Sequence, residues 1–350
     1  MGEPFADTAP AIRDAAIDSL QRGRTRYTQL TGLPALREAV AGSIAKEMGR
    51  TVSSSEVVLT HGGSAGLASA LLATVRPGDR VILQDPTYSL YVDHLAMLGA
   101  EPLWLPGAED GGIDFDALDA LAPSARMFVL CNPSNPTGRV IGQDEMTSLE
   151  ALMLRHPDVL LLADEAYSSI VFDGRKFVSA LTLNAVADRV IVSRTFSKAY
   201  AMTGWRLGYT IAEPETAAGI NLVHRTINGA LNTFVQDAGI SALATSEDEI
   251  VSMAAEYQLR RDLVVGTLKG IPRVSLIVPG GAFYAFPRIE TELTSDQLVS
   301  RFAEGGVLLR SGSEFGPSGE GHLRISFATD VDSLTTGLDR FSATVAGLSA

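Results

Sequence analysis

Short apolar runs alternate with helix-type patterns up to about residue 213. Short, mostly apolar runs rich in valine, isoleucine and leucine occupy 57–60, 81–84, 127–131, 159–163, 190–193 and 207–211. Before and between these runs, apolar residues three and four positions apart predict helices at 10–22, 34–48, 65–75, 88–98, 114–121 and 143–155. Strands that are apolar at every position are covered on both faces, so this region predicts a mostly parallel sheet between two layers of helices.

The pattern changes after residue 213. Two long helical patterns, 214–245 and 247–269, follow one another without a strand between them. Short strands are then predicted near 274–278, 282–286, 306–309 and 322–327, and helices near 294–303 and 331–347. We therefore predict an α/β three-layer sandwich over 25–246, and a smaller α+β domain formed by 1–24 and 247–350.

Composition narrows the class of protein. The chain has 350 residues and a net charge of −13, which argues against nucleic acid or an anionic membrane as a partner. The single cysteine, Cys131, excludes an intrachain disulfide and suits a reducing compartment. No apolar run approaches the ~20 residues of a membrane span, and no signal peptide is visible at the start. We expect a cytoplasmic protein with no metal site.

One lysine occupies an unusual position. The chain has four lysines, and Lys46, Lys176 and Lys269 lie where solvated surface charges are expected. Lys198 instead follows the strand beginning at Val190, next to the hydroxyl of Ser197. The carboxyl ends of strands in α/β sheets are where such sheets bind ligands. The working hypothesis is that Lys198 forms a Schiff base with a carbonyl cofactor.

Other polar groups follow other predicted strands. Gly62-Gly63-Ser64 lies between a strand and a helix, so it is either a plain tight turn or an anion site built from backbone amides. Asp164 follows the run 159–163 and is either a helix N-cap or a ligand group. Two Asn-Pro pairs, at 132–133 and 135–136, predict a rigid turn that can include a cis bond.

Two arginines are candidates for binding an anion. Arg206 lies eight residues after Lys198, and Arg324 lies in the predicted strand 322–327. A guanidinium group grips an oxyanion with two parallel hydrogen bonds. The alternative for either arginine is a surface ion pair.

The order of these groups along the chain resembles the class I/II aminotransferases, a family of fold-type I pyridoxal-phosphate enzymes. The resemblance covers nearly the whole chain and implies the three-layer fold of that group. It is specific for the family and hardly specific for the substrate. The motifs that carry it are Gly2-Glu-Pro, Tyr27-x4-Gly32-x3-Leu36-Arg37, Asp85-Pro-Thr-Tyr88, Asn135-Pro-Thr-Gly138, Asp164-x2-Tyr167, Ser197-Lys198, Gly204-Trp-Arg206-Leu-Gly208 and Leu323-Arg324-Ile-Ser.

The resemblance implies roles around the cofactor ring. Lys198 would hold pyridoxal 5′-phosphate as a Schiff base and would then move the substrate proton. Asp164 would keep the ring nitrogen protonated, so that the ring can accept electrons. Asn135 and Tyr167 would hydrogen-bond the phenolic oxygen of the ring, and Tyr88 would stack on its face. Lys198, Asp164 and Tyr167 are thus the implied catalytic residues.

The resemblance also implies binding sites for phosphate and substrate. The cofactor phosphate would be held by Gly63, Ser64, Ala65, Thr195, Ser197 and Arg206. Tyr27 would reach the phosphate of a neighbouring subunit, so the expected unit is a homodimer. Arg324 would bind the α-carboxylate of the substrate, with Gly2 and Asn135 beside it.

Two departures from the family pattern limit these expectations. Family members usually carry an arm before Gly-Glu-Pro, and this sequence begins at that motif, so we expect either a late start or a member without the arm. Some bacterial aspartate aminotransferases place a lysine after the Gly-Gly of the phosphate turn, where this chain has Ser64. Aspartate specificity is not supported by that route, and the sequence indicates no other reader of a distal charge.

The expected activity is a ping-pong exchange of an amino group between an L-amino acid and a 2-oxo acid. The alternatives on the same scaffold are a lyase, a decarboxylase, a racemase or a cyclising synthase, because fold does not determine reaction. A cofactor-free binding protein is the alternative from another class. It is disfavoured because Lys198, Asp164, Arg206 and Arg324 are all present.

Overall fold

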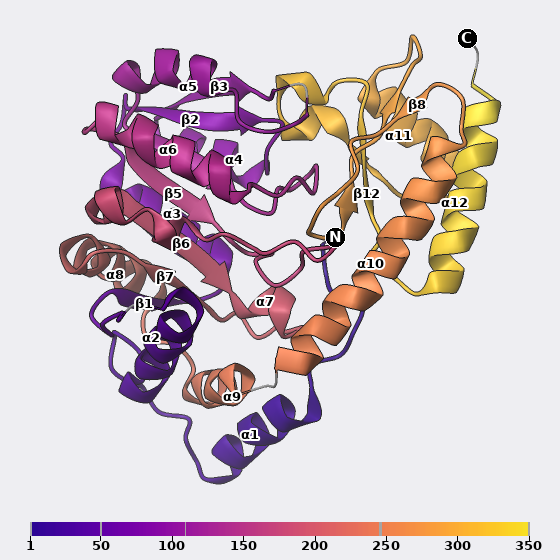
Figure 1. The fold of residues 1–350 in the computed structure, drawn as a ribbon. Coiled ribbons are helices and arrows are strands. Elements are labelled where there is room, and N and C mark those ends of the chain that lie inside the picture. The colour runs from indigo at the N-terminus through magenta and orange to yellow at the C-terminus, as the bar shows by residue number, and fades with distance from the viewer. Residues whose placement is uncertain (1, 50, 109, 245–246, 349–350) are drawn as a thin grey trace.

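Two parts of the chain lie side by side in Figure 1, a large part built on a sheet and a smaller part that contains the C-terminal helices. The structure is a computed structural model, and it describes residues 2–49, 51–108, 110–244 and 247–348. None of the helices in these ranges is both long enough and apolar enough to cross a membrane.

The large part is organised around one sheet, which within the described residues has seven strands in the order β1-β7-β6-β5-β4-β2-β3. All neighbouring pairs are parallel except those that involve β7, which runs antiparallel to both β1 and β6. The predicted mostly parallel sheet is confirmed. The strands are β1 Val57–Thr60, β2 Arg80–Asp85, β3 Glu101–Pro106, β4 Met127–Cys131, β5 Leu160–Asp164, β6 Val190–Thr195 and β7 Gly208–Ile211.

Helices cover both faces of this sheet, because every central strand carries apolar side chains on both sides. One core contains residues of α1 Pro10–Gln21, α2 Pro34–Met48, α5 Phe115–Leu121, α6 Gln143–Arg155 and α9 Thr233–Leu243. The opposite core contains residues of α3 Gly63–Thr74, α4 Leu90–Leu98 and α8 Pro214–Asn228. The short helix α7 Phe196–Ala199 follows β6, and the 3-10 turns are η1 Ala122–Ser124, η2 Ala180–Thr182 and η3 Asn184–Arg189.

The smaller part has a core of its own, in which Phe302 stacks on Phe341 with 4.5 Å between ring centroids. Among its described residues are two small antiparallel sheets, β10-β8 and β11-β12-β9. Its elements are α10 Glu247–Lys269, β8 Val274–Ser275, β9 Tyr284–Ala285, β10 Arg288–Ile289, α11 Ser295–Glu304, β11 Arg310–Ser311, η4 Gly312–Phe315, η5 Pro317–Gly319, β12 Leu323–Ser326 and α12 Val331–Ala346.

Three sequence predictions of elements are wrong. The single helix predicted at 214–245 is two helices, because Gly229 at φ +73° ends α8 and a new helix begins at Thr233. The strand predicted at 306–309 is absent from that segment, and β11 forms directly after it, at Arg310–Ser311. The pattern also missed β3, an edge strand that can contain Pro102 because one side of it makes no ladder hydrogen bonds.

The N-terminal helix lies against the large part rather than against the C-terminal helices. Ile12 and Ala16 of α1 are buried in the same core as α2 and α9. The domain limits 25–246, and 1–24 with 247–350, stay a prediction.

Candidate active site

A cavity of about 560 Å³ opens at the carboxyl ends of β4, β5 and β6, between the large part and the smaller part. Parallel strands direct their carboxyl ends to one edge of a sheet, so residues far apart in sequence converge there. Twelve of the residues named from the sequence line this cavity: Gly2, Gly63, Ser64, Tyr88, Asn135, Asp164, Tyr167, Thr195, Ser197, Lys198, Arg206 and Arg324. Ala65 and Tyr27 do not line it.

Lys198 is placed by the end of β6. Thr195 caps α7, because its hydroxyl accepts a hydrogen bond from the backbone N–H of Ser197 at 3.1 Å. The Lys198 ammonium group donates to the carbonyl oxygen of Gly2. Burial lowers the pKa of Lys198 to about 8, although the charges of Glu3 and Asp164 oppose this shift. A lower pKa leaves more of the lysine as neutral amine near pH 7, which is the form that attacks a carbonyl.

Asp164 is the last residue of β5 and is almost completely buried. Its Oδ2 accepts a hydrogen bond of 2.7 Å from the hydroxyl of Tyr91, and its Oδ1 accepts one of 3.1 Å from the backbone N–H of Ala166. Burial raises the pKa of Asp164, and these two bonds and Lys198 oppose that rise. The N-cap alternative is wrong, because residues 166–169 form a turn and no helix starts there.

Arg324 and Asn135 meet across the cavity. The Arg324 guanidinium donates to Oδ1 of Asn135 at 3.0 Å and lies 4.4 Å from the ring centroid of Tyr284. Arg324 is 5% exposed, and its Nε has no hydrogen-bond partner among the residues that the structure describes. The surface ion pair is therefore wrong for Arg324. The hydroxyl of Tyr167 is 2.9 Å from that of Tyr284. Tyr284 therefore contacts both Tyr167 and Arg324.

The turn before α3 forms a cradle of backbone amides. Gly62 has φ +81°, and a Cβ on it would collide with the guanidinium of Arg206. Arg206 donates to the carbonyl of Thr203 at 2.9 Å and to that of His61 at 3.4 Å. In the ranges that the structure describes, Arg206 makes no ion pair with a carboxylate, so the surface-pair alternative does not describe it either. An N-terminal helix turn with a free guanidinium is suited to an anion.

The Asn-Pro turn after β4 has cis bonds at both Asn132–Pro133 and Asn135–Pro136, as the sequence allowed. Tyr27 lies outside the cavity and is 94% exposed. Sequence reasoning missed Tyr91 and Arg310. Tyr91 follows the spacing of an ordinary core residue of α4, and nothing in the sequence marks its hydroxyl as the partner of Asp164.

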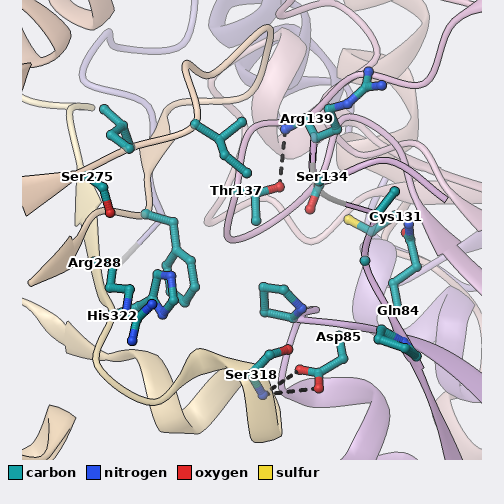
Figure 2. A pocket seen from close by; sticks show the side chains of 18 of the residues that line it. Gln84, Asp85, Cys131, Ser134, Thr137, Arg139, Ser275, Arg288, Ser318 and His322 are labelled. Carbon is teal, nitrogen blue, oxygen red and sulfur yellow. Dashed lines mark hydrogen bonds between the residues drawn. The ribbon is translucent and has the colours of Figure 1, made fainter. Parts of the chain in front are cut away.

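A second cavity, of about 460 Å³, lies next to the first and shares Cys131 with it (Figure 2). Ser318 and Asp85 close one side of it, where the Ser318 backbone N–H donates to both carboxylate oxygens at 3.1 and 3.0 Å. His322, which also lines this cavity, stacks on Phe286 at 4.8 Å between ring centroids. The second cavity contains neither Lys198 nor Asp164.

A three-layer α/β fold with a half-buried lysine, a buried carboxylate and an anion cradle at one sheet edge is typical of an enzyme that binds a carbonyl cofactor. The sequence profile of the family "Aminotransferase class I and II" matches residues 1–341. An aspartate aminotransferase of Pyrococcus horikoshii is 32% identical over 99% of this chain and 90% of its own length. An aspartate/prephenate aminotransferase of Cereibacter sphaeroides is also 32% identical, over 99% and 90%.

Solved structures give the same result. The crystal structure of an aspartate aminotransferase from Rhizobium meliloti has a TM-score of 0.95 at 32% identity and covers 100% of this chain and 91% of that one. An aromatic aminotransferase from Pyrococcus horikoshii has a TM-score of 0.94 at 30% identity, over 99% and 94%. The chain belongs to the class I and II aminotransferases and has their fold-type I architecture.

Proposed function

We propose that this aminotransferase exchanges an amino group between an L-amino acid and a 2-oxo acid in two half-reactions, with pyridoxal 5′-phosphate bound in the first cavity. The observation that carries the proposal is the pairing of a half-buried amine with a lowered pKa, on Lys198, and a buried carboxylate, on Asp164, in one cavity. The domain junction and the sheet edge are both positions where cofactor sites occur.

The residues present fit this cofactor. Its phosphate needs amide N–H groups, hydroxyls and a cation, which the turn at Gly63, the side chains of Ser64, Thr195 and Ser197, and Arg206 supply. A Cβ on Gly62 would meet the tip of the Arg206 side chain, so an alanine there would push the guanidinium out of its place in the cradle. Ala65 would contribute its backbone amide only.

The ring of the cofactor would lie between Tyr88 and the floor of the cavity. Asp164 would accept a hydrogen bond from the ring nitrogen, since Tyr91 and Ala166 leave part of its carboxylate free. Asn135 and Tyr167 would donate to the phenolic oxygen. When bound, the cofactor supplies an electron sink for the carbanion formed at the substrate Cα.

The chain supplies the proton transfer and the orientation of the substrate. Lys198, once released from covalent attachment by the incoming amine, is the only base for which we propose a role at Cα, and its lowered pKa suits proton transfer near neutral pH. Arg324 would bind the substrate α-carboxylate with donors that Asn135 does not occupy, among them the unpartnered Nε. Gly2 would lie beside it, because its carbonyl already contacts Lys198.

We also propose a homodimer in which Tyr27 reaches the neighbouring site. Tyr27 is 94% exposed, an unusual state for a large aromatic side chain, and it is the residue for which the family resemblance implies a role across a subunit boundary. Sedimentation at micromolar concentration tests this proposal, and a sedimenting monomer that is fully active would contradict it.

A donor panel tests the reaction itself. Purified protein loaded with the cofactor is mixed with each L-amino acid and either 2-oxoglutarate or pyruvate, and the new keto acid and the new amino acid are both quantified. A transaminase forms them in equal amounts and only when an acceptor is present. Keto acid, CO₂ or a racemised amino acid without an acceptor would instead indicate one of the alternative reactions. The Lys198→Ala protein is expected to be inactive with every donor.

A further inference from the structure

A second arginine faces the first cavity from the strand next to Arg324. Arg310 lines the cavity together with Arg324, Tyr88 and Tyr284. The strands β11 and β12 are antiparallel, and their register places Arg310 directly opposite Arg324. Side chains directly opposite on such a pair point to the same face of the sheet. Both guanidinium groups also lie near the ring of Phe315, at 5.7 Å for Arg310 and 4.9 Å for Arg324.

Two like charges directly opposite each other are unfavourable unless an anion compensates them. Arg324 is buried and, within the described residues, has no carboxylate partner. Arg310 is less buried, with 44% of its side chain exposed, and its Nη2 pairs with the carboxylate of Glu314 four residues later. A guanidinium group has five N–H donors in a planar fork. Glu314 contacts only one side of the Arg310 guanidinium. The other donors make no hydrogen bond within the described ranges of the chain.

The charge of the cavity is positive although the chain as a whole is strongly acidic. Four cationic side chains line it (Lys198, Arg206, Arg310 and Arg324), against two acidic ones (Glu3 and Asp164). Both Arg310 and Arg324 lower the pKa of Tyr88 against the upward effect of its burial, so both charges act in the substrate end of the cavity. In the proposed function, Lys198 reacts with a carbonyl group, Arg206 binds the phosphate and Arg324 binds the α-carboxylate. The proposed function assigns no such group to Arg310.

We propose that Arg310 determines substrate specificity by binding the second carboxylate of a dicarboxylic amino acid or oxo acid while Arg324 binds the first. Two carboxyl carbons joined through three C–C bonds of about 1.5 Å are separated by roughly 4 Å, close to the roughly 5 Å between directly opposite Cβ atoms on paired strands. Glu314 holds the guanidinium at the cavity when no dicarboxylate is bound, and its negative charge offsets part of the attraction between Arg310 and the substrate. This inference rests on the proposed function, in which Arg324 takes the α-carboxylate.

The inference explains how a chain with Ser64 in the phosphate turn can still recognise an acidic side chain. The relatives do not decide this question, since their names include both aspartate and aromatic aminotransferases. The competing explanation is that Arg310 only fastens the segment 310–314 through its bond to Glu314.

Matched donors separate the two explanations. Glutamate and glutamine, and likewise aspartate and asparagine, differ by one charge at equal length, so the ratio of their kcat/KM values isolates recognition of the distal charge. The ratio is measured for the holoenzyme, for Arg310→Met, which keeps an unbranched apolar stem and removes the charge, and for Glu314→Gln. Thermal unfolding of each variant shows that it is folded.

The expected ratio favours the dicarboxylate in the wild type. It falls by about tenfold or more in Arg310→Met, because a charge-assisted hydrogen bond is lost. It rises in Glu314→Gln, because the carboxylate that offsets the positive charge of Arg310 is gone. The fastening role predicts an unchanged ratio in both variants, since losing either partner would then harm both donors alike. Equal losses for both donors in Arg310→Met, or a ratio that does not rise in Glu314→Gln, would overturn the proposal.

A binding measurement keeps this test independent of the reaction. Calorimetric titration of the holoenzyme with succinate and with butyrate compares a dianion with a monoanion of equal length. Succinate is expected to bind more tightly to the wild type, and Arg310→Met is expected to remove most of that difference. If the wild type transaminates no donor but shows this pattern, the proposed function fails and the role of Arg310 stands. Equal binding of the two acids to the wild type would refute the role of Arg310 whatever the reaction is.

Discussion

Replacement of Tyr91 by phenylalanine removes one hydrogen bond from the centre of the site. The Tyr91 hydroxyl is fully buried and donates to Oδ2 of Asp164 at 2.7 Å. Asp164 then keeps only the 3.1 Å bond from the backbone N–H of Ala166. A hydrogen bond to a charged group contributes about 1.5–3 kcal/mol, and an acceptor left buried without a partner costs a similar amount. We therefore expect Tyr91→Phe to lower the free energy of unfolding of the apoprotein by about 1.5–3 kcal/mol at neutral pH.

The dependence of this loss on pH follows from the pKa of Asp164. Burial raises that pKa above its ordinary value of 3.8, so stability from this group is fully present below 3.8 and is lost as pH rises through the folded-state pKa. Tyr91 opposes the rise, so its removal raises the pKa of Asp164 further and more stability is lost at neutral pH. The difference between the two proteins is thus largest at neutral pH and shrinks on acidification.

Urea unfolding of the apoprotein at several pH values measures this difference directly. Tyr257→Phe is the matched control, because Tyr257 is also a buried tyrosine but its hydroxyl accepts from the backbone N–H of Phe5 at 3.2 Å. Removal of the Tyr257 hydroxyl should lower the free energy of unfolding by about 1 kcal/mol, and this loss should not depend on pH. The acid limb of kcat/KM should also move to higher pH in Tyr91→Phe alone. An acid limb that stays in place, or equal losses in the two variants at every pH, would refute the role of Tyr91.

Three further predictions concern the scaffold and the cofactor site. The buried carboxylate of Glu165 accepts a hydrogen bond from Arg194 at 2.9 Å. Glu165→Ala is therefore expected to lower the free energy of unfolding by about 3–5 kcal/mol. A loss under about 1 kcal/mol in urea denaturation would contradict this. The rate at which apoprotein takes up pyridoxal phosphate covalently should rise as pH increases through about 8, the pKa of Lys198, because only the neutral amine reacts, and a flat profile would count against this. Gly62→Ala should weaken cofactor binding by about tenfold or more in equilibrium dialysis. Gly49→Ala is its control because Gly49, at φ +65°, carries similar backbone strain but has open space around it, so equal effects in both variants would show that strain alone is responsible.

The sheet and the residues at its edge could be predicted because one physical rule governs both. Strands buried on two faces are apolar throughout, as β4 is, or over most of the buried run, as β6 is from Val190 to Val192, and a polar residue at the end of such a run is then conspicuous. Asp164 and Lys198 were found in this way. The strands of the smaller part are only two residues long in β8, β9, β10 and β11, which is too short to show any periodicity.

That limit explains why Arg310 was missed. The apolar residues 307–309 suggested a strand there, but the ladder with β12 forms at Arg310 and Ser311. Only the register places Arg310 opposite Arg324, and register comes from tertiary packing rather than from the local pattern. Tyr91 was missed for a different reason, because a helix-spaced tyrosine has the same pattern whether or not its hydroxyl has a partner.

The covalent position of the cofactor tests the central claim most directly. Apoprotein is incubated with pyridoxal phosphate, reduced with borohydride and digested, and the peptides are identified by mass spectrometry. Because the chain has only four lysines, every candidate peptide can be distinguished. We expect the phosphopyridoxyl group on the peptide that contains Lys198, and its loss in Lys198→Ala. Modification of Lys46, Lys176 or Lys269 in its place, or an unmodified Lys198 peptide at saturating cofactor, would show that Lys198 does not hold the cofactor.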